Sequence, residues 1–506
     1  MAARPRLWPG HFQFCGGICF RPTTESSGCK IAACRLPPAS HSVKVMSSQN
    51  RPRIVVVGAG FGGLTAAQKL AHLPVEITVL DRKNHHTFQP LLYQVATAGL
   101  SPAEIAAPIR EVLARNANVE VLLGEATGFD VARRLVKLQN AEIPYDYLVV
   151  AAGATHAYFG HNDWPPLAPG LKTIEDALEM RRRLLLAFEI AEREALLTGT
   201  HWPVNFVIVG AGPTGVELAG TMAEIRRHSL AGNFRAIDPR KTRVLLVEAG
   251  PSVLSTYPED LRASAVRQLE HLGVEVRTDS PVTDIGEGFV CIREERVAAS
   301  VVLWAAGVSA SSLGGALGAP TDRAGRVLVE ADLSVPGHRE IFVIGDLASL
   351  NSSEGVQLPG VAPVAIQQGK WVARQIADDL AGRPRKPFHY LDKGSLATIG
   401  RAAAIAEFGK VHISGFLAWC SWLFIHIFFL IGFRNRIVVM FQWAWSYFTF
   451  ERAARLITGE AANVPLPSLE YIEHSAKTAH GSTEGLATGP TTSPVAGASQ
   501  ASRHNA

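Results

Sequence analysis

The chain has 506 residues, more than a single hydrophobic core normally serves, so two or more domains are expected. Hydrophobic residues make up 47% of it and charged residues only 19%, against roughly 25% charged residues in an average soluble domain. We therefore expect either strongly buried sheets or a part that contacts a membrane. The net charge of +4 is small, and no basic block is interleaved with aromatic residues, which excludes a nucleic-acid partner.

The two ends of the chain differ from the rest. Residues 1–50 are rich in Arg, Pro, Gly, Ser and Cys, and we interpret them as a disordered leader or a start placed too far upstream of Met46. An Arg-rich transit peptide is the alternative. Four of the six cysteines lie in this leader without a zinc-type spacing, so no metal site is expected. Residues 474–506 have little to bury and are predicted to be a disordered tail.

The stretch RIVVVGAGFGGLTAAQKL, from Arg53 to Leu70, has the pattern of a buried parallel strand, a glycine-rich turn and a helix. The glycines of a dinucleotide-binding turn give a tight turn, close approach of the pyrophosphate and packing of helix on strand, and here they are Gly58, Gly60 and Gly63. Phosphates are expected at the helix N-terminus, where free N–H groups favour negative charge. The next strand ends at Asp81, which is placed to bind ribose hydroxyls.

The same pattern returns in FVIVGAGPTGVELAGTM, with a strand followed by Gly210, Gly212 and Gly215. Its following strand ends at Glu248, after a longer gap that we attribute to a loop around residues 231–240. An acid at this position repels the 2′-phosphate of NADPH, so NADH is the expected nucleotide. Two complete units in one chain predict two nucleotide sites.

Each unit is followed by an apolar strand that runs into small residues, YDYLVVAAGA and then ASVVLWAAGV. Gly153 and Gly307 lie where these strands end, and we expect the chain to pass close to a nucleotide there. A further strand in REIFVIGDLA ends at Gly345 and Asp346, an acid with backbone N–H groups beside it.

This arrangement resembles the two-dinucleotide-binding-domain flavoproteins, whose fold is glutathione-reductase-like. The resemblance implies that the first unit holds FAD, that the second holds NAD(P)H, and that Gly345 and Asp346 bind the ribityl and phosphate part of the flavin. Hydride then passes from nicotinamide to flavin. Disulfide reduction is excluded because no cysteine pair follows the first helix, and Cys291 alone is a poor candidate for sulfide oxidation.

Three longer segments closely resemble the type II NADH dehydrogenases, the single-subunit NADH:quinone oxidoreductases. They read NHHTFQPLLYQVATAGLSPAEIAAP, LKTIEDALEMRRRLLLAFEIAE and PGVAPVAIQQGKWVARQI, and the resemblance runs from about Arg53 to Ile457. It implies that Gln367 and Gln368 lie beside the flavin and the quinone. One departure is Pro363, where many members of the family carry Gln.

Other candidate site residues lie in the same segments. Tyr93 and Gln89 are candidates, with a packed loop as the alternative. Glu189 is a candidate for a role at the flavin or in proton delivery, and the alternative is a structural role. The alternative for Gln367 and Gln368 is a pair of exposed amides. His85 and His86 are interpreted as polar loop residues rather than catalysts. The helix that opens near Pro363 is expected to aim its N-terminus at the flavin, where it would stabilise negative charge.

The segment from Phe416 to Phe433 has 18 residues without a charge, and a second apolar run follows Arg434-Asn435-Arg436. Eighteen helical residues reach about 27 Å, which is short of a ~30 Å hydrocarbon core. Four of the nine tryptophans lie here, and such rings favour the headgroup level. We predict two helices lying in one leaflet and joined by the basic pair at the surface. A true span and a buried helical hairpin are the alternatives.

We therefore expect an α/β fold with two Rossmann-like dinucleotide-binding domains and a C-terminal membrane-associated helical hairpin. The FAD domain is expected in two pieces, residues 51–170 and 309–410. The NADH domain is expected at 171–308 and the anchoring helices at 411–457. The expected enzyme passes a hydride from NADH to FAD and two electrons to a membrane quinone. It does not pump protons, because the chain has no array of ionisable residues in several spans.

A reductase of a protein acceptor and a membrane-anchored redox sensor are the alternative functions. We expect attachment to the cytoplasmic face of a cell inner membrane, or to an organelle inner membrane if the leader is a transit peptide. The expected partners are NADH, a membrane quinone and the lipid bilayer, and a homodimer is a candidate assembly.

Overall fold

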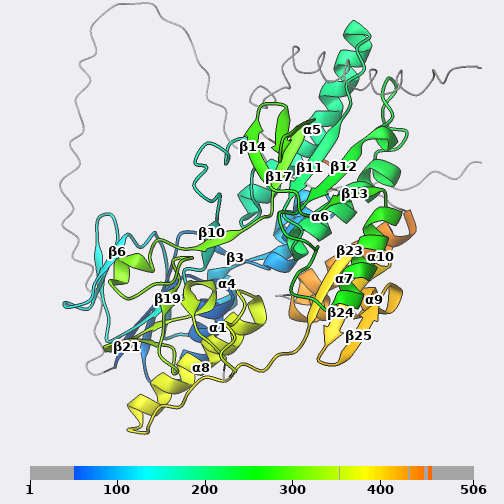
Figure 1. The fold of residues 1–506 in the computed structure, drawn as a ribbon. Helices are drawn as coiled ribbons and strands as arrows, with labels where there is room; N and C mark the ends of the chain where they lie inside the picture. Colours follow the sequence, from blue (N-terminus) through cyan, green and yellow to red (C-terminus); the bar gives the residue numbers. More distant parts are fainter. Residues whose placement is uncertain (1–50, 353, 431–432, 450–453, 459–506) are drawn as a thin grey trace, which may run out of the picture. The chain divides into compact units, whose positions relative to one another are not determined.

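The computed structural model describes residues 51–352, 354–430, 433–449 and 454–458. The leader and the tail discussed above lie outside the described residues. The described chain contains two large sheets that are almost wholly parallel, three small three-stranded antiparallel sheets and the helices that pack around them (Figure 1).

The first sheet has the strand order β20-β21-β9-β1-β2-β5, and all its pairs are parallel except that of β20 with β21. Its strands are β1 (Arg53–Val57), β2 (Glu76–Asp81), β5 (Val119–Leu123), β9 (Tyr147–Val150), β20 (Ser334–Val335) and β21 (His338–Val343). Ile54 and Val56 pack against helices α1 (Phe61–Leu70) and α8 (Ala362–Leu380). Val55 and Val57 belong to a second core on the opposite face. Burial on both faces explains why β1 is an unbroken apolar run.

Helices α1 and α8 pack unusually closely, and Figure 1 shows them beside the first sheet. A Cβ placed on Gly369 of α8 would lie 2.4 Å from the carbonyl oxygen of Gly62 in α1. Only a glycine allows the two backbones to meet at this point. The contact joins residues 51–70 to residues 362–380, so both ends of the expected FAD region belong to one packed unit.

Several short elements connect β2 to the second sheet. They are β3 (His85–Thr87), β4 (Ala106–Pro108), the turn η1 (Gln89–Leu91), α2 (Leu92–Ala96), α3 (Pro102–Ile105), α4 (Ile109–Leu113) and the small sheet of β6 (Gly128–Asp130), β7 (Leu135–Lys137) and β8 (Glu142–Pro144). The long helix α5 (Ile174–Thr198) follows. Thr173 and Asp176 form a capping box at its start, and Gly199 ends it at φ 72°.

The second sheet has the order β13-β12-β11-β17, and all its pairs are parallel. Its strands are β11 (Asn205–Val209), β12 (Arg243–Val247), β13 (Val274–Arg277) and β17 (Val301–Trp304). Helices α6 (Pro213–Glu224) and α7 (Glu259–His271) follow β11 and β12. The long gap before Glu248 contains a π-turn, η2 (Ile225–Ser229), and a 3-10 turn, η3 (Pro239–Lys241). A small sheet is inserted before β17, with β14 (Val282–Gly286), β15 (Phe289–Ile292) and β16 (Glu295–Ala298).

A two-stranded ribbon, β10 (Ala154–His156) with β18 (Val308–Ala310), joins the regions of the two sheets. The remaining short elements lie between β18 and α8. They are η4 (Gly315–Leu317), η5 (Gly345–Leu347), β19 (Val327–Leu328) and β22 (Ala348–Ser349).

The C-terminal region differs from the expectation in two respects. Residues 411–414, expected at the start of the anchoring helices, form strand β25 (Val411–Ser414) of a sheet with β23 (Ser395–Gly400) and β24 (Ala403–Phe408). The helices that follow are α9 (Phe416–Phe429) and α10 (Phe433–Thr449). The basic residues do not join these helices, because 434–436 lie in the first turn of α10. Among the described residues, neither helix is long and apolar enough to cross a bilayer.

Candidate functional site

The first glycine-rich turn has a geometry that fits a bound pyrophosphate. Gly58 adopts φ 96°, and a Cβ there would lie 2.4 Å from the carbonyl oxygen of Ala151. A Cβ on Gly63 would lie 1.8 Å from the carbonyl oxygen of Gly58, so this glycine lets α1 pack on β1. Gly60 is different, because a Cβ there would meet no protein atom within 4 Å. The space beside Gly60 is open, as a cradle for a phosphate requires.

This turn borders a cavity of about 430 Å³ between the first sheet and the start of α5. Six of the predicted cofactor-binding residues line it, namely Gly58, Gly60, Asp81, Gly153, Gly345 and Asp346. The predicted candidate Gln89 also borders it. Residues that are far apart in the sequence therefore line one continuous cavity.

Two carboxylates of this cavity are held in place by their neighbours. Asp81 accepts hydrogen bonds from the backbone N–H of Ala59 at 2.6 Å and of Lys83 at 2.7 Å. Asp346 lies 3.8 Å from the ammonium group of Lys172. The first contact fixes the Asp81 carboxylate directly beside the glycine turn, where a nucleotide ribose would meet it.

Lys172 and the N-terminus of α5 also belong to the cavity wall, although neither was expected there from the sequence. Asp176 accepts backbone hydrogen bonds from Lys172 at 3.0 Å and Thr173 at 2.9 Å, and it lies 3.2 Å from His156 Nε2. Burial alone would raise the pKa of Asp176, but these partners outweigh it and lower the pKa. The Thr-x-x-Asp capping box was the sequence signal that could have placed a helix start here.

The two predicted glutamines of α8 have different surroundings. Gln368 is only 1% exposed, and its side-chain Oε1 accepts a hydrogen bond from the backbone N–H of Gly345 at 2.7 Å. Gln367 is half-buried and exchanges two hydrogen bonds with the backbone of Leu391, at 2.9 and 3.0 Å. Gln368 is therefore not an exposed amide, and it supports the turn that carries Asp346.

The histidines of β3 are not loop residues. His86 is buried, its Nδ1 lies 2.9 Å from the carbonyl oxygen of Ala59, and its ring meets that of Phe61 edge-on. Burial lowers the pKa of His86. The neighbouring His85 lines the cavity.

The second glycine-rich turn repeats the geometry of the first. Gly210 adopts φ 99°, and a Cβ on Gly215 would lie 1.9 Å from its carbonyl oxygen. Gly212, like Gly60, faces open space. Glu248 accepts hydrogen bonds from the backbone N–H of Ala211 at 2.7 Å and of Gly250 at 2.9 Å. Gly307 directly follows the Ala305-Ala306 segment that packs against Gly210.

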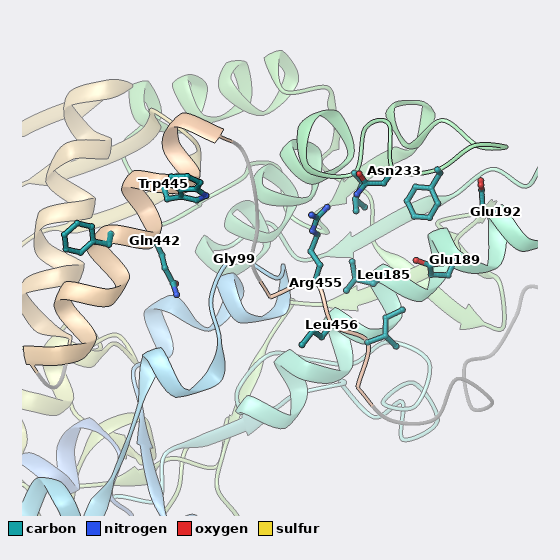
Figure 2. A pocket seen from close by; sticks show the side chains of 13 residues that line it. Gly99, Leu185, Glu189, Glu192, Asn233, Gln442, Trp445, Arg455 and Leu456 are labelled. Atoms are coloured by element: carbon teal, nitrogen blue, oxygen red, sulfur yellow. The ribbon is translucent and has the colours of Figure 1, made fainter. Parts of the chain in front are cut away.

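Tyr93 and Glu189 line two other cavities. Tyr93 is buried in α2, accepts a hydrogen bond from Gln94 at 2.9 Å, and borders a cavity of about 110 Å³ together with Trp422. Glu189 of α5 lines a cavity of about 960 Å³ (Figure 2). Gly99 borders both cavities. The four predicted catalytic residues are therefore not brought together at one point.

The large cavity is mainly apolar, and its wall combines the middle of α5, the end of α10 and residues 455–457 (Figure 2). Apolar wall residues are Leu185, Leu230, Phe234, Phe441, Trp445, Leu456 and Ile457. Arg455 borders it and donates a hydrogen bond to the carbonyl oxygen of Ser229 at 2.8 Å.

The chain matches two family profiles that together cover most of the described residues. The family profile described as pyridine nucleotide-disulphide oxidoreductase matches residues 52–369, and the profile of the NDH2 C-terminal domain matches residues 393–452. The chain is 44% identical over 448 residues to the type II NADH:quinone oxidoreductase Ndh of Mycobacterium tuberculosis, covering 85% of this chain and 96% of that protein. It is 31% identical over 362 residues to the type II NADH:quinone oxidoreductase of Staphylococcus haemolyticus, covering 70% and 89%.

The fold is also that of a solved structure. NDH2 of Plasmodium falciparum in complex with NADH matches with a TM-score of 0.72 at 18% identity, over 81% of this chain and all of that one.

The two turns and the cavity beside Gly60 thus define a flavoprotein of the pyridine nucleotide-disulphide oxidoreductase class. Within that class, the chain belongs to the type II NADH:quinone oxidoreductase family. It is a flavin-dependent oxidoreductase that uses FAD and NADH and reduces quinone without pumping protons.

Proposed function

We propose that the protein is attached to one leaflet of a membrane by α9 and α10. The first cavity would bind FAD, and the second glycine-rich turn would bind NADH. When bound, FAD supplies the redox step by accepting a hydride from NADH and passing two electrons to quinone. We place the protein on the cytoplasmic face of a cell inner membrane, where NADH is available. The observation that carries the proposal is the apolar surface of the two helices.

Large apolar side chains are exposed on both helices. Phe424 is 70% and Phe428 58% exposed. Further exposed apolar side chains are Phe416, Leu417, Phe429, Met440, Phe441 and Trp445. Soluble monomers rarely leave so many large apolar residues together in water, and lipid contact removes them from it.

Other side chains of the hairpin pack against the rest of the protein. Trp422 of α9 is buried, with its ring centroid 6.5 Å from that of Tyr93 and 5.3 Å from that of Trp443. The indole N–H of Trp443 donates to the side chain of Gln94 at 2.7 Å. This packing supports a hairpin that is part of the catalytic body rather than a tethered anchor.

In the first cavity, different residues would bind different parts of FAD. The open space at Gly60 and the N–H groups of α1 would take the pyrophosphate. Asp81 would bind the ribose of the adenosine part, and Asp346, supported by Gln368 through Gly345, would bind the ribityl part. Gly153 borders the same cavity.

At the second turn, Gly212 would admit the pyrophosphate of NADH, and Glu248 would bind its adenosine ribose. Two backbone hydrogen bonds orient the Glu248 carboxylate. Its negative charge would repel the additional phosphate of NADPH.

The large cavity is the proposed entry for quinone. Phe441 and Trp445 belong both to the exposed apolar surface and to the cavity wall, so an apolar tail can pass from lipid into the cavity. Glu189 is a carboxylate in this wall and would hold a proton for quinone reduction (Figure 2). Tyr93 borders the neighbouring small cavity and would line the path toward the flavin.

The test compares a short-chain quinone in solution with a long-tailed quinone in liposomes, both with NADH as the reductant. We compare the wild type with the double variant Phe424→Ser, Phe428→Ser, and a matched control carries Leu123→Ser, another exposed apolar residue. The double variant should leave the liposomes and lose most of its activity with the long-tailed quinone, while it retains activity with the short one. If the double variant stays bound and treats both quinones as the wild type does, the proposed membrane surface is wrong.

A further inference from the structure

Phe159 is an exposed aromatic residue on a strained turn. Its side chain is 70% exposed, its backbone adopts φ 51°, and the following Gly160 adopts φ 96°. Bulky L-residues rarely adopt positive φ, because the Cβ crowds the following carbonyl group. Neither burial nor backbone preference therefore accounts for a phenylalanine at this position.

The segment that precedes Phe159 is firmly held. The ring of Tyr158 stacks on that of Trp304 at 5.1 Å, and its hydroxyl donates to the carbonyl oxygen of Ala168 at 2.8 Å. The indole N–H of Trp304, the last residue of β17, donates to the carbonyl oxygen of Ala157 at 2.9 Å. These contacts fix the turn on the second sheet, and fixed surroundings are what allow a strained residue to persist.

The ring of Phe159 lies over Gly307. A Cβ placed on Gly307 would lie 2.7 Å from the Cζ of Phe159. Gly307 follows β17 at the carboxyl end of the second sheet, next to the glycine turn that follows β11. Phe159 is therefore exposed at the edge of the second sheet where a dinucleotide is expected to bind.

The strand order indicates which half of the dinucleotide would meet this ring. Strand β11 has β12 on one side and β17 on the other. Glu248 ends β12, so the adenosine half lies on the β12 side and the nicotinamide half extends past β11 toward β17 and Gly307. The backbone N–H of Ser311, just after β18, donates to the carbonyl oxygen of Gly153 in the wall of the first cavity. The β17 side is thus the side that leads to the FAD cavity.

We propose that the exposed ring of Phe159 contacts the nicotinamide half of NADH and positions it at the β17 edge. The proposal rests on the proposed assignment of NADH to the second turn. An aromatic ring presents a flat apolar face that can stack on a nicotinamide or cover its ribose, and it removes water from that contact. The strained backbone sets the direction of the ring before NADH arrives, which lowers the ordering cost of binding.

Phe159→Gly separates this role from a structural one, because glycine accepts the positive φ while the ring is lost. The FAD-loaded variant should unfold at the same or a higher temperature than the wild type. Its Kd for NAD⁺, measured by calorimetry, should rise about fivefold to tenfold, as expected for one lost aromatic contact. Its Kd for ADP, which lacks the nicotinamide half, should not change. The KM for NADH should rise with the Kd for NAD⁺.

Two further variants complete the comparison. Phe159→Tyr keeps the ring and should bind NAD⁺ like the wild type. Leu123→Gly, which removes another exposed apolar side chain, should leave both affinities unchanged.

The proposal is overturned if Phe159→Gly binds NAD⁺ as the wild type does, or if it loses affinity for NAD⁺ and ADP equally. If Phe159→Gly does not fold, the same measurements on Phe159→Ala decide between these outcomes. Gly212→Val tests the assignment of the second turn separately. If Gly212→Val still binds NAD⁺ and ADP normally, the assignment of NADH to this turn fails, whatever Phe159 does.

Discussion

The side chain of Gln368 accepts a hydrogen bond from the backbone N–H of Gly345 at 2.7 Å, and this bond links α8 to the turn that carries Asp346. Gln368 is almost fully buried, so its amide has no contact with solvent in the folded protein. We predict that Gln368→Leu lowers the free energy of unfolding by about 0.5–1.5 kcal/mol, the usual net contribution of one intramolecular hydrogen bond. FAD should also be lost more readily, which the flavin absorbance per protein after gel filtration measures.

Gln367→Leu is the matched control for this prediction. Gln367 is half-buried and bonds only to the backbone of Leu391, so its loss should leave the FAD content unchanged. Equal loss of FAD in both variants would show that the Gln368–Gly345 contact is not what supports the cavity.

Alanine substitutions at Gly60 and Gly63 should have different effects, the first on FAD binding and the second on folding. A Cβ on Gly60 meets no protein atom, so Gly60→Ala should fold normally and yet bind FAD poorly, because the methyl group occupies the pyrophosphate position. A Cβ on Gly63 collides with the backbone of Gly58, so Gly63→Ala should reduce the yield of folded protein itself. Thermal unfolding and flavin content, measured together, distinguish the two. Full flavin content in Gly60→Ala would contradict the assignment of FAD to the first turn.

Glu248 should set the choice between NADH and NADPH. Removing its charge with Glu248→Gln eliminates a repulsion on the order of 1 kcal/mol at about 4 Å in water. The ratio of kcat/KM for NADPH to that for NADH should therefore rise about fivefold to tenfold. Steady-state kinetics with both nucleotides and a soluble quinone measure it. A wild type that uses both nucleotides equally would show that Glu248 does not discriminate.

His86 should make FAD retention sensitive to acid. Burial lowers the pKa of His86 below its ordinary value of 6.5, so the unfolded chain binds the proton more tightly than the folded one. The stability contributed by neutral His86 is present above pH 6.5 and is lost as the pH falls from there toward the folded-state pKa. Because the ring contacts Phe61 and Ala59 of the first turn, loss of FAD should accompany this change.

The variant His86→Gln tests this explanation. It should retain FAD with a weaker dependence on pH below 6.5 than the wild type, in equilibrium dialysis at a series of pH values. His85→Gln is the control on the neighbouring position. An unchanged pH profile in His86→Gln would assign the acid sensitivity to other groups.

The two glycine turns could be predicted from the sequence because the steric reason for each glycine lies within a few residues of it in the chain. Gly63 and Gly58 are five residues apart, and the same spacing relates Gly215 to Gly210. The family resemblance predicted the activity. Neither signal could show that Lys172 reaches Asp346, because that contact depends on how α5 meets the first sheet.

Helix α9 ends at Phe429, before the end of the uncharged run, for a physical reason. The basic residues after Phe433 suggested a surface connection, but the Nε of Arg436 donates to the carbonyl oxygen of Leu430 at 2.7 Å. The arginine therefore caps the end of α9 from within α10. A charge pattern alone does not distinguish a residue that joins two helices from one that satisfies a helix end.

Glu189 and Glu192 lie nearly one turn apart on α5, and both line the large cavity (Figure 2). Their surroundings predict different roles. Glu192 accepts backbone hydrogen bonds from Arg235, Ala236 and Ile237 at 2.7 to 3.1 Å. Burial alone would raise the pKa of Glu192, but these N–H groups together outweigh burial and lower it. Glu189 has no such backbone partners in the described chain and is available to a molecule in the cavity.

We predict that Glu189→Gln lowers kcat for quinone reduction about tenfold or more, because general acid catalysis typically contributes at least that much. The FAD content, the Kd for NAD⁺ and the thermal stability should stay unchanged. Glu192→Gln should instead affect stability and leave kcat almost unchanged. At pH values above the ordinary pKa of glutamate, this variant should unfold at a lower temperature than the wild type. The stability difference should disappear as the pH falls through the folded-state pKa of Glu192, because the wild-type carboxylate is then protonated too. If Glu189→Gln reduces quinone at the wild-type rate at every pH, this carboxylate takes no part in proton delivery and the cavity serves only as a passage.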